Sequence, residues 1–129
     1  MDFQQQAKYY YIDLKQNCAV SILMGANDRY GLGLSMEDAK LVIGFGGGMG
    51  CGSTCGCVAG SMAVLGKLYA GRPDFRKLCS GFVKEFRECL GSTDCAVILP
   101  AHTSKDNRCL SAVLKAAALL EAYIAKIEN

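Results

Sequence analysis

The chain has 129 residues, 51% of them hydrophobic and 20% charged, a balance that fits one folded domain and excludes a disordered chain. The net charge is +2, with Lys and Arg scattered among Asp and Glu, so we expect no nucleic-acid partner. No apolar run reaches the roughly 18 residues that span a bilayer, and the first residues lack a signal-peptide pattern, so we expect a cytoplasmic protein without membrane contact.

The first part of the chain predicts two helices separated by a short break. The first covers residues 2–14, where apolar side chains recur at three- and four-residue steps. Asn17 is a typical N-cap for the second helix, which then begins at Cys18 and ends at Gly31 and Gly33. The apolar positions expected to face the core are Phe3, Ala7, Tyr10, Tyr11, Leu14, Ala19, Ile22, Leu23 and Ala26.

A third predicted helix follows Ser35, which forms a loose capping box with Asp38. Its expected apolar stripe consists of Met36, Ala39, Leu41, Val42 and Ile43. The next segment, residues 44–57, contains seven glycines among fourteen residues. This density predicts backbone at positive φ, or backbone packed where no Cβ fits. We reject a phosphate-binding loop, because the segment lacks the Lys that such a loop requires and no strand precedes it.

The second half of the chain begins with two long predicted helices. A strongly apolar helix covers residues 58–69 and carries small residues that allow another element to approach closely. Gly71 ends this helix. The next helix starts at Pro73, a residue that is common in the first turn, and ends at Gly91.

Two more predicted helices complete the chain. Ser92 or Thr93 caps a short helix, which Pro100 breaks. Ser104 then caps the last and longest helix.

We therefore predict an all-α fold, because no segment alternates between polar and apolar residues over more than four positions. The fold is a compact single-domain bundle of about six or seven helices over residues 1–129, with a Gly/Cys-rich loop before a central apolar helix. Gly and Ala at one-turn spacing on the helix faces allow a homodimer without requiring one.

Eight cysteines point to metal or redox chemistry, because a chain expected in a reducing compartment does not need a disulfide scaffold. Four of them, Cys18, Cys55, Cys95 and Cys109, stand near predicted helix starts. The positive potential of a helix start lowers the pKa of a thiol and favours the thiolate. Metal ligation and disulfide exchange both require this form.

The other four cysteines divide into two pairs. Cys51 and Cys57 lie in the glycine-rich loop and form CxxxC and CxC spacings with Cys55. Cys79 and Cys89 lie on the apolar stripe of the helix that starts at Pro73, so we expect them to pack in the core.

Several short motifs together resemble the C_GCAxxG_C_C family, whose members are described as redox-active, over residues 7–124. These motifs are Asn17-Cys18-Ala19-Val20, Phe45-Gly46-Gly47-Gly48-Met49-Gly50 and Cys55-Gly56-Cys57-Val58-Ala59-Gly60, followed by Cys95 and Cys109. The resemblance implies that the four signature cysteines are Cys18, Cys55, Cys95 and Cys109. The family's CGAxxG motif falls on residues 55–60, with Cys57 where the family has Ala, and Cys51 is extra to the pattern.

The family is similar to the cysteine-bearing domain of split-Soret cytochromes, in which such cysteines are associated with an iron–sulfur centre. This chain lacks the CxxCH motif of covalent haem attachment, so only the iron–sulfur part of the likeness carries over.

Three functions remain open from the sequence. The first is an electron-transfer protein that exchanges electrons with a redox partner protein. It binds an iron–sulfur cluster or another metal through the four signature cysteines, and Cys57 or Cys51 could replace one of these ligands. The second is a thiol–disulfide oxidoreductase or redox sensor in which Cys55 is the nucleophile and Cys57, Cys51 or Cys18 resolves the mixed disulfide. The third is a structural helical module with zinc or with no metal.

Overall fold

Residues 2–129 are described by a computed structural model, and the predicted all-α fold is confirmed: this part of the chain contains seven α-helices, three short segments of other helix types and no strand. The α-helices are α1 (Phe3–Lys8), α2 (Cys18–Tyr30), α3 (Met36–Ala39), α4 (Gly56–Tyr69), α5 (Phe75–Leu90), α6 (Cys95–His102) and α7 (Leu110–Glu128). The other segments are the π-helical η1 (Tyr9–Asp13), the 3-10 helix η2 (Lys40–Phe45) and η3 (Gly48–Gly52), a tight turn in which Met49, Gly50 and Cys51 have non-helical backbone angles.

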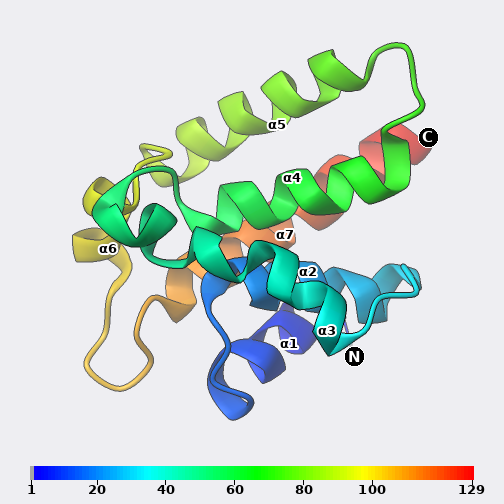
Figure 1. Ribbon diagram of the computed structural model, residues 1–129. Coiled ribbons are helices and arrows are strands. Elements are labelled where there is room, and N and C mark those ends of the chain that lie inside the picture. Colours follow the sequence, from blue (N-terminus) through cyan, green and yellow to red (C-terminus); the bar gives the residue numbers. More distant parts are fainter. Residues whose placement is uncertain (1) are drawn as a thin grey trace.

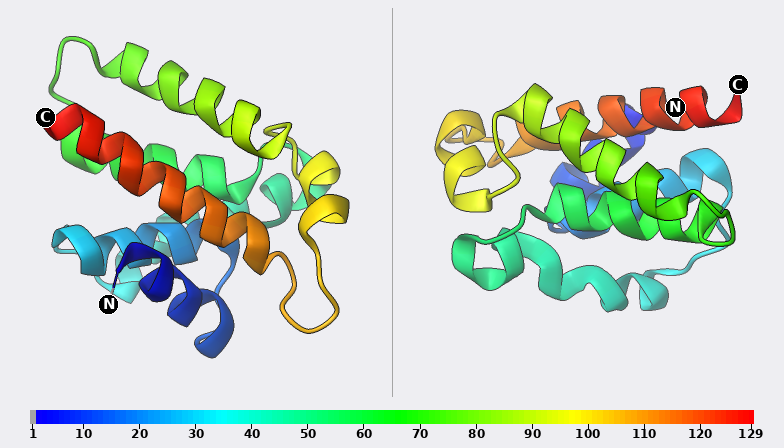
Figure 2. Two further views of the ribbon diagram at one scale, coloured as in Figure 1. Left: turned by 180° about the vertical axis from the view of Figure 1, so that it is seen from behind. Right: turned by 90° about the horizontal axis from the view of Figure 1, so that it is seen from above.

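The helices form a bundle around one continuous core. Helices α4 and α7 lie in the middle, α5 covers them on one side, and α1 and α2 lie on the other (Figures 1 and 2). The largest fully buried side chains come from most of these helices and are Phe3, Ile22, Leu65, Phe82, Phe86, Ile98 and Leu120. No helix within residues 2–129 is long and apolar enough to cross a membrane.

Helix α2 begins and ends as its sequence predicts. The Asn17 side chain accepts a hydrogen bond from the Val20 N–H at 2.9 Å, and Asn17 Nδ2 donates to the Ile43 carbonyl at 2.7 Å. Gly31 adopts a left-handed conformation with φ of 65° and ends the helix. Asn17 therefore fixes the first turn of α2 and also ties it to η2.

Close packing between α2 and α4 aligns the starts of the two helices. A Cβ at Gly60 would lie only 2.7 Å from the Ala19 carbonyl oxygen, so the two backbones approach as closely as glycine permits. This contact brings the first turns of α2 and α4, each with a signature cysteine, to the same end of the bundle.

Two N-terminal helices differ from their predictions. The first ends as an α-helix at Lys8 and continues as π-helical η1, which leaves Leu14 40% exposed. The third is capped by Ser35 and Asp38 as predicted, but it lasts one turn and passes into η2. Because a 3-10 helix has three residues per turn, the predicted stripe splits, and Leu41 and Ile43 face solvent.

The boundaries of α5 and α6 also differ from the predicted ones. Pro73 lies before α5, whose N-cap is Asp74. Asp94, and not Ser92 or Thr93, is the N-cap of α6. Pro100 does not end α6, because it removes a single amide donor and the Thr103 N–H still bonds to the Leu99 carbonyl at 2.9 Å.

The last helix starts later than Ser104 predicts. Ser104 Oγ accepts a hydrogen bond from the Asn107 N–H at 3.0 Å, but the turn that it caps does not continue, and Arg108 has a φ of 50°. Helix α7 begins at Leu110 with Cys109 as its N-cap. The left-handed Arg108 interrupts the helical path and sets the position of Cys109.

The prediction that Cys79 and Cys89 pack in the core is wrong. Cys89 is exposed and Cys79 is half-buried, because Phe82, Phe86 and Leu90 occupy the core-facing side of α5. Neither thiol lies near the other cysteines in the pocket described next.

Candidate functional site

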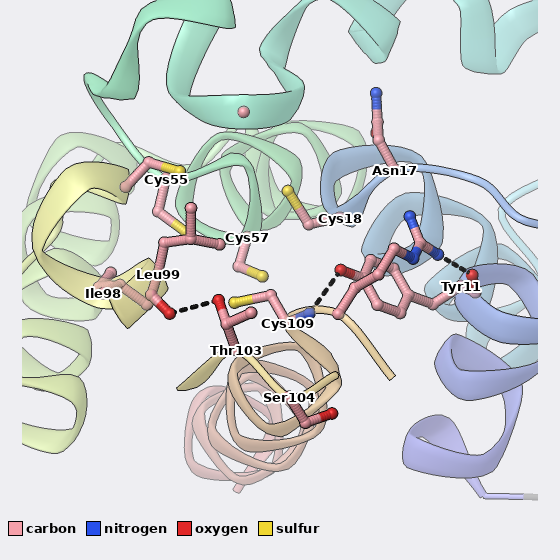
Figure 3. A pocket seen from close by; sticks show the side chains of 13 residues that line it. Tyr11, Asn17, Cys18, Cys55, Cys57, Ile98, Leu99, Thr103, Ser104 and Cys109 are labelled. Carbon is pink, nitrogen blue, oxygen red and sulfur yellow. Dashed lines mark hydrogen bonds between the residues drawn. The ribbon is translucent and has the colours of Figure 1, made fainter. Parts of the chain in front are cut away.

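Five of the eight cysteines line one pocket of about 390 Å³ at the end of the bundle where α2, α4 and α7 begin (Figures 1 and 3). They are Cys18, Cys55, Cys57, Cys95 and Cys109. The four signature cysteines thus come together although up to 91 positions (109 − 18) separate them in the sequence. Cys51 does not line this pocket: it is exposed, and its thiol donates to the Gly48 carbonyl at 3.5 Å.

Each signature cysteine stands at a helix start, as predicted. Cys18 and Cys95 are the first residues of α2 and α6, and Cys55 and Cys109 are the N-caps of α4 and α7. Helix starts present free backbone N–H groups and a positive potential. Four such ends around one pocket favour negatively charged sulfur within it.

The glycine-rich loop joins the start of α4 to the start of α6. The Cys55 N–H donates to the Thr93 carbonyl and the Cys95 N–H donates to the Ser53 carbonyl, each at 2.7 Å. These two hydrogen bonds form a short antiparallel bridge between the segments that precede the helices. The bridge thereby fixes the backbone at both Cys55 and Cys95, which line the same pocket.

Glycines 48 and 56 make room for the cysteines. A Cβ at Gly48 would lie 2.6 Å from the Cys95 Cβ, and Gly48 also has a φ of +64°, which L side chains rarely adopt. A Cβ at Gly56 would overlap the Cys18 sulfur. The density of glycine in this loop therefore reflects both positive φ angles and close approach to the cysteines.

Cys57 lies between two signature cysteines and carries one thiol proton. This proton can be donated in a hydrogen bond to the sulfur of Cys18 or to that of Cys55. That hydrogen bond, with further donation from the N–H groups of Gly47 and Ala19, outweighs burial and lowers the pKa of Cys18 to about 7. Cys18 therefore has substantial thiolate character near neutral pH.

The pKa of Cys55 is lowered by the same donor. The hydrogen bond from Cys57 has the largest effect, and the N–H groups of Cys57 and Val58 in the first turn of α4 add to it. The pKa of Cys57 itself is raised well above its usual value, because hydrogen bonding of its proton to Cys18 or Cys55 and complete burial both favour the neutral thiol. Cys57 therefore acts as the donor and its two neighbours as the acceptors.

The two remaining cysteines of the pocket favour the protonated form in the metal-free protein. Burial, followed by the nearby thiolates of Cys55 and Cys18, raises the pKa of Cys95 and raises that of Cys109 to about 11. The pKa shifts within the pocket thus run in opposite directions: downward for Cys18 and Cys55, and upward for Cys57, Cys95 and Cys109.

Tyr11 and Arg108 hold Cys109 at the pocket. The Cys109 N–H donates to the Tyr11 hydroxyl at 3.0 Å. The Arg108 guanidinium lies 3.9 Å from the centre of the Tyr11 ring and donates to the Tyr11 and Gln16 carbonyls. Arg108 is the one charged residue among those that line the pocket within residues 2–129.

Sequence reasoning did not identify Tyr11 or Arg108 as residues of the site. Its apolar spacing placed Tyr11 on the core side of the first helix, and no local pattern indicated its contact with residues 108 and 109. The sequence feature that could have indicated a role for Arg108 is its position directly before the signature cysteine Cys109.

The pocket offers soft sulfur donors in a largely apolar wall that includes Ile98 and Leu99. Such a site suits a thiophilic metal centre or dithiol–disulfide chemistry. Within residues 2–129, no group of three or more His, Cys, Asp or Glu side chains is positioned to hold a single metal ion.

A model of one protein family, described as "Putative redox-active protein (C_GCAxxG_C_C)", matches residues 16–123, a range that includes all eight cysteines. No curated protein and no solved structure matches the chain.

Proposed function

The chain belongs to the C_GCAxxG_C_C family, whose members are described as redox-active, and we propose that it is an electron-transfer protein that binds an iron–sulfur cluster. The ligands are Cys18, Cys55, Cys95 and Cys109. The observation that carries this proposal is that four cysteines from four helix starts face one pocket.

The donor set fits a cluster better than a single zinc ion. Zinc requires its ligands to converge on one point in a tetrahedral arrangement. No group of three or more candidate ligands within residues 2–129 converges in this way. An iron–sulfur cluster distributes its thiolate ligands over two or more iron atoms, so the ligands surround a cavity and do not converge on one point. The distribution of the four cysteines around a pocket of about 390 Å³ supports this second arrangement.

The surrounding residues suit a buried anionic centre. Backbone N–H groups of Gly47, Ala19 and Val58 already point at the sulfurs of Cys18 and Cys55, and hydrogen bonds to sulfur tune a cluster's potential. The side chains of Ile98 and Leu99 add an apolar part to the pocket wall. When bound, the cluster supplies one-electron transfer to a redox partner protein.

The proposal is tested by anaerobic purification followed by iron and acid-labile sulfide analysis. We expect brown protein that contains both elements. Serine substitution of any one of the four ligands should remove most of the cluster, because serine is a poor ligand for iron in this setting. Two matched controls should keep it: Cys89→Ser, whose thiol is exposed on α5, and Cys51→Ser, whose thiol lies outside the pocket.

Protein without iron and sulfide would contradict the proposal. Wild-type protein that contains neither iron nor sulfide after anaerobic reconstitution is not an iron–sulfur protein. Colourless protein that contains zinc, or that has no metal and ordinary thiols, would favour a structural module.

A second function, thiol–disulfide exchange, is favoured by the hydrogen bonds that connect Cys57 to Cys18 and Cys55. The Cys55 thiolate would attack a substrate disulfide and release one substrate thiol. Cys57 or Cys18 would then attack the mixed disulfide, release the second substrate thiol and leave a protein disulfide. Cys51, outside the pocket, is a poor resolving residue. Under this function, Cys55→Ser abolishes exchange and does not change metal content.

A further inference from the structure

Tyr11 places an unused hydrogen-bond donor at the cysteine pocket. The side chain is only 4% exposed and lines the pocket. Its hydroxyl oxygen accepts the Cys109 N–H at 3.0 Å, while no acceptor within residues 2–129 receives the hydroxyl proton. Figure 3 shows this hydroxyl directed toward Cys18 and Cys109. A donor on a pocket wall without a protein acceptor is free to hydrogen-bond to a group that binds in the pocket.

The orientation of the Tyr11 ring is fixed from its other side. Arg108 stacks on the ring at 3.9 Å and binds the Tyr11 and Gln16 carbonyls, so ring and guanidinium hold each other in place. The π-helical turn η1 supports this placement through the Gln16 N–H, which bonds to the Tyr10 carbonyl at 3.0 Å. The hydroxyl is therefore held at the pocket before any group binds there.

We propose that the Tyr11 hydroxyl donates a hydrogen bond to a sulfur atom of the centre bound in the pocket. This hydrogen bond raises the reduction potential of that centre. This inference rests on the proposed iron–sulfur function. Reduction adds negative charge to the cluster and its sulfur ligands, so a hydrogen bond to sulfur stabilises the reduced form more than the oxidised form. Tyr11 is thus a contact residue that tunes the centre without ligating it.

The test compares Tyr11→Phe with the matched control Tyr10→Phe. Both side chains are buried on η1, but Tyr10 faces Asp28 and does not line the pocket. We expect both variants to bind as much iron and sulfide as wild type. Tyr11→Phe should lower the midpoint potential by up to about 59 mV, which is a tenfold change for a one-electron couple, and Tyr10→Phe should leave it unchanged.

A second readout reports the hydrogen bond itself. In D₂O, the reduced wild-type cluster should couple magnetically to an exchangeable deuteron that is missing from Tyr11→Phe and present in Tyr10→Phe. If Tyr11→Phe does not fold, 3-fluorotyrosine at position 11 provides an isosteric alternative. Its hydroxyl is a stronger donor, so the potential should rise.

The outcomes separate this inference from the function on which it rests. Wild-type protein without iron and sulfide overturns the proposed function and removes the sulfur acceptor for Tyr11. A loaded Tyr11→Phe protein with the wild-type potential and the wild-type deuteron coupling overturns the role of Tyr11 alone. An unchanged potential in the fluorotyrosine protein has the same meaning.

Discussion

Cys57 changes the chemistry of its two neighbours. Its thiol lies between Cys18 and Cys55 and can donate its proton to the sulfur of either one. A hydrogen bond to a thiolate favours the charged form, so the lowered pKa values of Cys18 and Cys55 depend mainly on this one side chain.

Cys57→Ala should therefore raise the pKa of Cys18 in the metal-free protein. Without the donor, the neutral thiol is favoured, and the pKa moves up from about 7 toward the usual thiol value. Alkylation of Cys18 at pH 7 should slow roughly tenfold, because only the thiolate reacts. The rate is measured against pH by iodoacetamide labelling of the tryptic peptide 16–29, which contains Cys18 as its only cysteine.

Cys51→Ala is the control for this experiment, because Cys51 is exposed and outside the pocket. Its pH profile at Cys18 should match that of wild type. If Cys57→Ala has the same midpoint as Cys51→Ala, the thiolate character of Cys18 comes from the helix start and not from Cys57.

The residues of the site could be predicted only as far as local signals reach. Helix-start patterns identified Cys18, Cys55, Cys95 and Cys109, because capping is a local property. Cys51 is only four residues from Cys55, yet it lies outside the pocket, and Gly52 between them has a positive φ of 78°. The contact between Tyr11 and Cys109 joins residues 98 positions apart, so no local pattern contains it.

At the scale of the elements, the contact between α2 and α4 leaves no room for a side chain larger than that of glycine at position 60. Gly60→Ala would place a methyl group 2.7 Å from the Ala19 carbonyl oxygen, and a backbone atom cannot move away without displacing the helix. We expect a loss of about 1–3 kcal/mol in the free energy of unfolding. Urea denaturation followed by circular dichroism measures this loss.

Gly66→Ala is the matched substitution in the same helix. Its new methyl group would meet Phe75 Cζ at 4.0 Å, an ordinary contact, and alanine favours helix over glycine. The free energy of unfolding should rise by roughly 0.5–1 kcal/mol. Equal effects of the two substitutions would show that helix propensity, and not the α2–α4 contact, governs position 60.

Element boundaries were predicted well where a cap acts alone and poorly where tertiary contacts compete. Asn17, Ser35 and Gly91 cap or end their helices as their sequence indicates. Ser104 also caps a turn, but the Arg108 side chain binds η1 and holds the backbone in a left-handed conformation that ends the turn. That interaction depends on the folded bundle, so the capping signal at Ser104 placed the start of α7 too early.

At the scale of the whole molecule, the site results from helix direction. Helices α2, α4 and α7 run the same way, so their starts lie at one end, and α5 runs back to that end before α6 begins (Figure 1). The amphipathic pattern of each helix predicts burial but not its direction relative to helices far away in sequence. The fold class was therefore predictable from the sequence, whereas the gathering of the cysteines could be stated only as an expectation.

If the proposed cluster binds, the same layout makes α6 the part of the bundle that we expect to depend most on it. Ile98 is its only buried residue, and Val97 and Leu99 are 57% and 45% exposed. Cluster ligation through Cys95 and Cys109 would tie α6 and the loop that follows it to α2 and α4. Amide hydrogen exchange in residues 95–109 should then slow by about tenfold or more on cluster loading. Exchange in the second half of α7 should change little, because Leu120 and Ile124 already anchor that part of the helix in the core. Mass spectrometry of hydrogen exchange in anaerobic metal-free and cluster-loaded protein checks this prediction. Uniform slowing along the chain would contradict it, because the centre would then stabilise the bundle as a whole and would not order α6.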